Sequence, residues 1–250
     1  MSGHSHWATI KHKKGAIDAK RGKLWSKLAR AIIIAARHGG GDPTMNLKLR
    51  YAIDKARSVS MPKDNIERAI KRGTGEIEGV TYEEITYEGY APGGVAVMVD
   101  TLTDNRNRTS GEIRKIFERN GGNLGSAGCV GYLFERKGLL AVPKKSVDED
   151  TLMGIVLDAG ADDMKVSGEQ YEITCDPASF NAVKAALEAK GLTPDHAEIT
   201  QLAKVNIDAD LESARKVMNL MAALDDHDDA QNVYSNLNMT DEVLAAAEQA

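Results

Sequence analysis

The first 75 residues of the chain show the hydrophobic period of α-helices, interrupted by glycine and proline. Apolar side chains recur every three or four residues from Leu24 to Ala35, which predicts a helix that begins near Asp18. Glycines at positions 39–41 predict the end of this helix, because glycine readily takes the left-handed conformation of a helix C-cap.

Two shorter helices are predicted to follow. Asp42 is the expected N-cap of the second helix and Pro43 its first residue, a position that proline favours. The third helix is expected to begin at Pro62 and to end at Gly73. Three helices of this length, joined by short connections, predict a small bundle.

After Gly75 the pattern changes to short strands and turns. The next segment predicts the order ββαβ, over residues 84–88, 95–102, 111–119 and 129–135. Thr109 or Ser110 is the expected N-cap of the helix.

Residues 138–205 predict a complete unit of their own. Its elements follow the order βαββαβ, which is the ferredoxin-like arrangement, over residues 139–142, 148–159, 165–167, 171–175, 178–190 and 197–205. A helix over 209–224 and a strand over 232–237 remain, and they would complete the earlier ββαβ segment into a second sheet-and-helix unit.

We therefore expect an α+β protein, in which an N-terminal helical bundle precedes two α/β sandwich domains, one ferredoxin-like and inserted into the other. The expected domains are a basic helical domain over 1–76, a discontinuous α/β domain over 77–137 plus 206–250, and the inserted domain over 138–205.

Charge is distributed very unevenly along this chain. The 250 residues carry 32 Lys and Arg against 37 Asp and Glu, but residues 1–73 hold 17 of these cations and only 5 of the anions. This segment has a net charge of +12, and the remainder of the chain has −17. Such asymmetry indicates contact with a polyanion, either a nucleic acid or an anionic membrane. The segment lacks the large apolar face of an interfacial helix, so we expect no membrane partner.

The two cysteines, Cys129 and Cys175, each lie in an apolar run and are expected to be buried free thiols in a reducing compartment. The sequence shows neither an N-terminal hydrophobic signal region nor an apolar run that could span a bilayer. We therefore expect a cytoplasmic protein.

The candidate nucleic-acid contacts form two clusters. Those of the first lie within one short basic stretch: Trp7, Lys11, His12, Lys13, Lys14, Lys20, Arg21, Lys23 and Lys27. Its one acid is Asp18, its glycines let the backbone approach phosphate, and its tryptophan can stack on a base. The second cluster is Arg106 and Arg108. The alternatives are a solvated basic face for the first cluster and, for the second, a polar loop whose arginines pair with Asp104 or Glu112.

We predict neither catalysis nor a metal, a cofactor or a small-molecule substrate. The glycine-rich residues 120–129 lead from helix into strand, whereas phosphate-binding loops lead from strand into helix. His4, His6 and His12 lack partners at zinc-like spacing. The acidic run 225–229 lacks the glycine and final glutamate of a calcium loop and is expected to be a solvated connection.

Short, specific blocks are spread over the whole chain: GHSHW (3–7), KHKK (11–14), DAKRGK (18–23), GGGDP (39–43), AIDKA (52–56), YEGYAPGG (87–94), DNRNRT (104–109) and GGNLG (121–125), with Asn46, Leu49 and Arg50. Together they resemble the YebC/PmpR family, which also includes the mitochondrial translational activator of cytochrome oxidase. The resemblance implies a helical N-terminal domain and two α/β domains, one inserted into the other. His6 departs from the lysine expected in the first block.

What the resemblance implies about function leaves more than one target open. Bacterial members are catalogued as transcriptional regulators that bind DNA, whereas the mitochondrial relatives act in translation, and bacterial members have been linked to ribosomes paused on proline-rich stretches. We therefore expect a non-enzymatic nucleic-acid-binding regulator of gene expression, with promoter DNA as its target. The alternatives are a translation factor that binds ribosomal RNA or tRNA on the ribosome, and a protein-interaction scaffold. The sequence shows no helix-turn-helix with polar readers at the start of its recognition helix, and a glycine-spaced basic arm suits irregular RNA.

Overall fold

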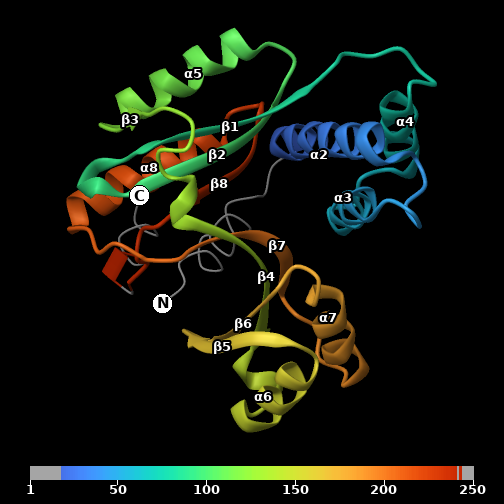
Figure 1. The fold of residues 1–250 in the computed structure, drawn as a ribbon, viewed down its shortest axis with the longest axis vertical. Coiled ribbons are helices and arrows are strands. Elements are labelled where there is room, and N and C mark those ends of the chain that lie inside the picture. Colours follow the sequence, from blue (N-terminus) through green and yellow to red (C-terminus); the bar gives the residue numbers. More distant parts are fainter. Residues whose placement is uncertain (1–17, 241, 244–250) are drawn as a thin grey trace.

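The computed structural model describes residues 18–240, 242 and 243, with side chains from Arg21 onward (Figure 1). These residues form a helical bundle and two four-stranded antiparallel sheets, each covered by helices. The predicted α+β class is therefore confirmed. None of the described helices is both long enough and apolar enough to cross a lipid bilayer.

The bundle contains helices α2 (Asp18–Gly39), α3 (Leu47–Ser58) and α4 (Lys63–Thr74). Its core is aliphatic, and Ile32 of α2, Leu49 of α3 and Ile66 of α4 are buried in it. The first helix begins near Asp18, as its hydrophobic period predicts.

The N-cap predicted for the second helix is wrong. Helix α3 begins at Leu47, and the side chain of Asn46 caps it by accepting a 3.1 Å hydrogen bond from the Leu49 N–H. Asn46 also donates to the carbonyls of Ala35 and Gly40, both at 2.8 Å, so one buried side chain joins the end of α2 to the start of α3. Asp42 instead accepts a hydrogen bond from the Thr44 N–H within a turn.

The predicted end of the third helix is also wrong, because Gly73 lies inside α4 and Gly75 is the left-handed C-cap, with φ of 83°. Gly73 is buried where α4 crosses α2. A Cβ atom on Gly73 would lie 2.5 Å from the carbonyl oxygen of Ile33 and 2.6 Å from the Ala36 Cβ. This glycine is therefore required by helix packing and not by backbone conformation.

The first sheet has the order β3-β1-β2-β8, with all neighbours antiparallel. Its strands are β1 (Glu83–Tyr90), β2 (Ala96–Thr103), β3 (Asn123–Leu124) and β8 (Ala230–Ser235), and its helices are α5 (Arg106–Arg119) and α8 (Leu211–Asp225). Both helices pack on one face, where Phe117 and Leu220 are fully buried (Figure 1). A short 3-10 turn (Pro92–Gly94) joins β1 to β2.

The second sheet has the order β5-β6-β4-β7 and is also antiparallel. Its elements are β4 (Phe134–Pro143), α6 (Glu149–Asp158), β5 (Ala161–Ser167), β6 (Gln170–Cys175), α7 (Phe180–Ala189) and β7 (His196–Ala203), with a 3-10 turn (Lys144–Ser146) after β4. The order βαββαβ and this strand arrangement confirm the predicted ferredoxin-like fold.

Two of the predicted strands, over 129–135 and 139–142, are wrong in their bounds. They are replaced by a 3-10 turn (Gly131–Leu133) and the single long strand β4, which pairs with β7 along most of its length. Charged residues at 135–137 conceal this continuity in the sequence. Gly138 follows them, and a Cβ atom at this position would lie 2.6 Å from the Cys175 sulfur. The division into domains stays a prediction, and its expected border between residues 137 and 138 lies within β4.

The bundle contacts the second sheet through α3. The Tyr51 ring meets the Phe180 ring edge-on at 6.1 Å, and the Lys55 ammonium lies 3.3 Å from a Glu198 carboxylate oxygen. Both cysteines are free thiols, as predicted; Cys175 is buried and Cys129 is half-buried.

We predict that Gly73→Ala destabilises the protein by about 1–3 kcal/mol, because the added methyl group forces α4 away from α2. Urea unfolding followed by circular dichroism measures this loss. The matched control is Gly111→Ala in α5, where a Cβ meets no atom within 4 Å; it is expected to stabilise by up to about 1 kcal/mol. Equal unfolding midpoints for the two variants would contradict the packing role of Gly73.

Candidate nucleic-acid interface

The predicted contact residues are only partly within the described structure. Trp7, Lys11, His12, Lys13 and Lys14 lie outside the described residues, as does the side chain of Lys20. The structure describes Arg21, Lys23 and Lys27 on α2, and Arg106 and Arg108 on α5.

Lys23 and Lys27 lie one turn apart on α2 and face residues 225–229, which we call the acidic loop. The Lys23 ammonium lies 3.2 Å from an Asp226 carboxylate oxygen and 3.3 Å from one of Asp228. Burial alone lowers the pKa of Lys23, and these two carboxylates together raise it above its ordinary value. Lys27 donates a hydrogen bond to the backbone carbonyl of Asp225. Both predicted contacts are therefore already engaged within the protein.

Asp229, the last residue of the acidic loop, binds two arginines from distant parts of the chain. Its side chain is only 3% exposed and accepts hydrogen bonds from Arg30 at 2.9 Å, Arg108 at 2.8 Å and the Thr109 hydroxyl at 2.7 Å. Burial alone raises the pKa of Asp229, but these donors outweigh it and hold the pKa below its ordinary value. Asp229 is therefore a buried carboxylate that joins α2 to α5.

The start of α5 differs from the prediction. Asn105, and not Thr109 or Ser110, is the N-cap, because its side chain accepts a 3.1 Å hydrogen bond from the Arg108 N–H. The cluster of Arg106 and Arg108 is thus the first helical turn. Arg108 also pairs with Asp104 at 2.9 Å and approaches Glu112 at 3.8 Å, as in the alternative interpretation of this cluster.

Arg106 differs from Arg108 in its environment. Its side chain is exposed, and no hydrogen bond or ion pair joins its guanidinium to another residue of the described part of the chain. Of the second predicted cluster, Arg106 is therefore the side chain that remains accessible to a partner.

Arg30 was not among the residues predicted from the sequence. It binds the Asp229 carboxylate and, at 2.7 Å, the Asp228 carbonyl, and its guanidinium lies 5.5 Å from the centre of the Tyr82 ring. Because its partner is 199 positions away, no local pattern could indicate this contact.

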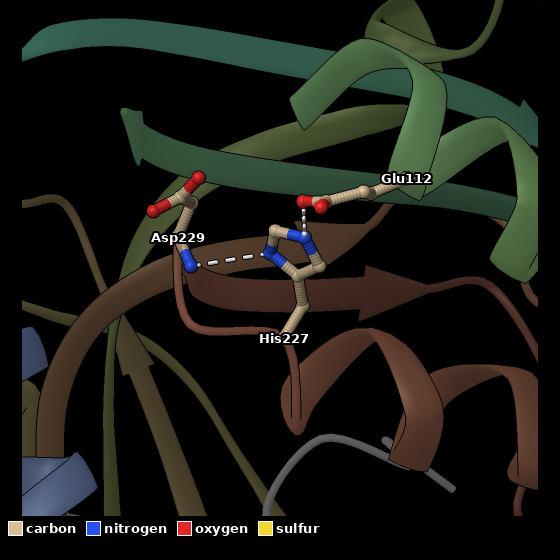
Figure 2. A group of neighbouring side chains, drawn as sticks. All are labelled: Glu112, His227 and Asp229. Carbon is tan, nitrogen blue, oxygen red and sulfur yellow. Dashed lines mark hydrogen bonds and ion pairs between the residues drawn. The ribbon is translucent and has the colours of Figure 1, made fainter. Parts of the chain in front are cut away.

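Glu112, His227 and Asp229 lie close enough together for their polar atoms to be considered as a metal site (Figure 2). The His227 Nδ1 accepts a 3.1 Å hydrogen bond from the Asp229 N–H, so its Nε2 carries the hydrogen that is donated to Glu112 at 2.9 Å. Both ring nitrogens are thus engaged, and two guanidiniums lie against the Asp229 carboxylate. This arrangement suits a hydrogen-bond network and not the binding of a cation.

The glycine-rich residues 120–129 connect α5 to the 3-10 turn before β4, passing through β3. Amides at the end of this run and directly after it bind an internal anion: the buried Glu88 carboxylate accepts hydrogen bonds from the N–H groups of Gly128, Val130 and Gly131 at 2.6–2.7 Å. Burial alone raises the pKa of Glu88, and the three amides together lower it below its ordinary value. Because a carboxylate already binds these amides, the segment offers a phosphate no comparable cradle.

We predict that Asp229→Asn destabilises the protein at pH 7 by about 3 kcal/mol, because it leaves the largely buried Arg30 without a countercharge and removes the buried partner of Arg108. Asp226→Asn is the control; its side chain is 77% exposed, and the change should cost less than about 1 kcal/mol. Both values come from urea unfolding. A loss no larger than that of the control would contradict the role of Asp229.

The stabilisation by Asp229 also depends on pH. Because folding lowers the pKa of this carboxyl, its contribution is complete above the ordinary aspartate pKa, near about pH 4, and is lost as the pH falls through the lower value of the folded protein. The difference in stability between the wild type and Asp229→Asn is therefore expected to shrink below about pH 4.

Two segments, which together make up most of the chain, match models of one protein family. Residues 5–76 match the model described as "TACO1/YebC protein N-terminal domain", and residues 82–237 match "TACO1/YebC second and third domain". Among curated relatives, proteins of Dictyoglomus turgidum and Geobacter sulfurreducens are 55% and 54% identical to this chain, over 98% of each sequence. Each of these two relatives bears the name "Probable transcriptional regulatory protein".

A solved structure gives the same result. The crystal structure of a conserved hypothetical protein from Aquifex aeolicus superposes with a TM-score of 0.82 and 50% sequence identity, covering 93% of this chain and 96% of that one. On these matches, which extend over nearly the whole sequence, the chain belongs to the TACO1/YebC family.

Proposed function

We propose that this protein is a non-enzymatic, nucleic-acid-binding regulator of gene expression that acts in the cytoplasm through its basic N-terminal segment. The observation that carries the proposal is the separation of charge, with +12 in residues 1–73 and −17 in the rest. A basic surface of this kind binds phosphate by releasing condensed counterions, and the acidic remainder is repelled from it. The regulator names of the relatives support the same role.

The contacts around the acidic loop refine which cations serve this role. Lys23 and Lys27 are held by the protein itself, and so the proposal relies on other cations of the basic segment. Four are exposed, and their charged groups make neither an ion pair nor a hydrogen bond with another described residue: Arg37, Arg68, Lys71 and Arg72. Together with residues 7–20 they provide the proposed contact surface.

The relatives' names favour promoter DNA as the target, but the bundle supports RNA as a second candidate. Residues 59–62 join α3 to α4 by a connection as short as that of a helix-turn-helix. The exposed first turns of α4, however, carry Asp64 and Glu67, and Lys63 pairs with Glu67 at 3.5 Å. Carboxylates at this position oppose entry of the helix start into a DNA groove, whereas single-stranded or looped RNA needs no such entry.

We predict that replacing Lys13, Lys14, Lys20 and Arg21 together by Ala weakens nucleic-acid binding and its dependence on salt. The slope of the logarithm of the binding constant against the logarithm of the salt concentration should become shallower. The change should be up to ~0.9 per lost contact on duplex DNA, or ~0.7 on a single strand. Fluorescence anisotropy over a salt series measures both quantities.

The control removes the same number of cations from the α/β part of the chain, where Lys145, Lys165, Lys190 and Lys216 are all exposed. Their replacement by Ala should leave the slope unchanged. Unchanged affinity in the first variant would exclude the N-terminal segment as the contact surface.

Sedimentation of cell extracts through a sucrose gradient separates the two targets. If RNA on the ribosome is the target, the protein should migrate with ribosomes, and the four N-terminal substitutions should abolish this. Migration at the top of the gradient, together with a footprint on promoter DNA, would assign it to transcription.

A further inference from the structure

A groove lies between α2 and α4 on the bundle. Its volume is about 270 Å³ and it is open to solvent. Its lining includes apolar side chains from both helices and the turn before α4, among them Ile33, Met61 and Ala69. This volume is slightly below the range of roughly 300–1,000 Å³ that is usual for pockets of drug-sized ligands. The groove therefore suits one flat group of modest size.

One wall of the groove is aromatic. The Trp25 indole donates a 3.2 Å hydrogen bond to the Val59 carbonyl, which fixes the orientation of the ring. The Arg21 guanidinium lies 5.6 Å from the centre of this ring. Arg21 is not part of the lining, and the Trp25 indole is the surface of this wall on which a nucleobase can stack.

The opposite wall carries anion-binding groups. Arg68 and Arg72 are one turn apart on the same face of α4; both line the groove, and both are exposed. Neither guanidinium forms an ion pair within the described part of the chain, and the lining residues include no carboxylate. Arginine binds phosphate through two parallel hydrogen bonds. Asn65 and Ser26 add polar groups of the kind that bind base edges.

We propose that this groove binds one unpaired nucleotide of RNA, with the base against the Trp25 wall and its phosphate on Arg68 and Arg72. The inference rests on the proposed function and names its ligand. A base within a duplex is covered by its neighbours on both faces, so only an unpaired base can enter a groove of this depth. The net positive charge of the lining complements a nucleotide, whereas it would repel a basic peptide.

The test uses the full-length protein and a single-stranded RNA probe. The chain has two tryptophans, so in a Trp7→Phe background the remaining signal comes from Trp25. We expect the RNA to quench Trp25 fluorescence. Arg68→Ala with Arg72→Ala should abolish this quenching and weaken RNA binding roughly ten-fold or more, since each charged hydrogen bond to phosphate is lost.

The matched control is Arg37→Ala with Lys71→Ala. Arg37 lies on α2 and Lys71 on α4, the two helices that form the groove. Both side chains are exposed, and neither lines the groove. This variant loses the same number of charges, so RNA binding should weaken through the loss of charge alone. The quenching of Trp25 fluorescence at saturating RNA should persist.

Three results would overturn the inference. They are RNA binding without a change in Trp25 fluorescence, equal loss of quenching in the two double variants, and equal quenching by fully paired duplex DNA. In each case the protein still binds nucleic acid, and the proposed function stands without this site. Absence of binding to every nucleic acid would instead overturn the proposed function and, with it, the inference.

Discussion

The structure depends on one buried charge, the carboxylate of Asp229. A carboxylate that is removed from water is stable only when donors replace its hydration, and here two arginines and a threonine do so. Arg30 comes from the bundle, whereas Arg108 and Thr109 come from α5, so a single side chain connects elements that are 199 and 121 positions away from it. Arg30 also lies over Tyr82, just before the first sheet. The position of the bundle relative to the first sheet is therefore set by electrostatics as well as by apolar packing.

This constraint divides the cations of the bundle into two groups. Lys23, Lys27 and Arg30 lie on the side that faces the acidic loop and are engaged there. Trp25 and the groove toward α4 lie on another side of the same helix, where Arg68 and Arg72 have no internal partner among the described residues. The net charge of +12 for residues 1–73 therefore overstates what is available to a partner. Part of that charge stabilises the fold, and the remainder provides the proposed contact surface.

Most of the order of the elements could be predicted from the sequence, but the two-residue strand β3, the continuity of β4 and several element ends could not. The ferredoxin-like unit is recognisable because hydrophobic period and turn residues are local properties. Asn46 replaces Asp42 as a cap because it can also reach the carbonyls of Ala35 and Gly40, which no local pattern indicates. The same limit applies to the site. A basic segment is visible in the sequence, but which of its lysines face Asp226 and Asp228 depends on contacts across some 200 positions.

The two kinds of pair on the acidic loop contribute differently to the attachment of the bundle. The carboxylates of Asp226 and Asp228 are 77% and 70% exposed, and such pairs contribute no more than about 1 kcal/mol each. These outer pairs on Lys23 therefore contribute little to the attachment of the bundle. The Asp229 carboxylate is buried, and separating it from Arg30 and Arg108 would leave both Asp229 and Arg30 without a charged partner. Asp229, and not the exposed outer pairs, is thus the ionic contact that keeps the bundle attached to the first sheet.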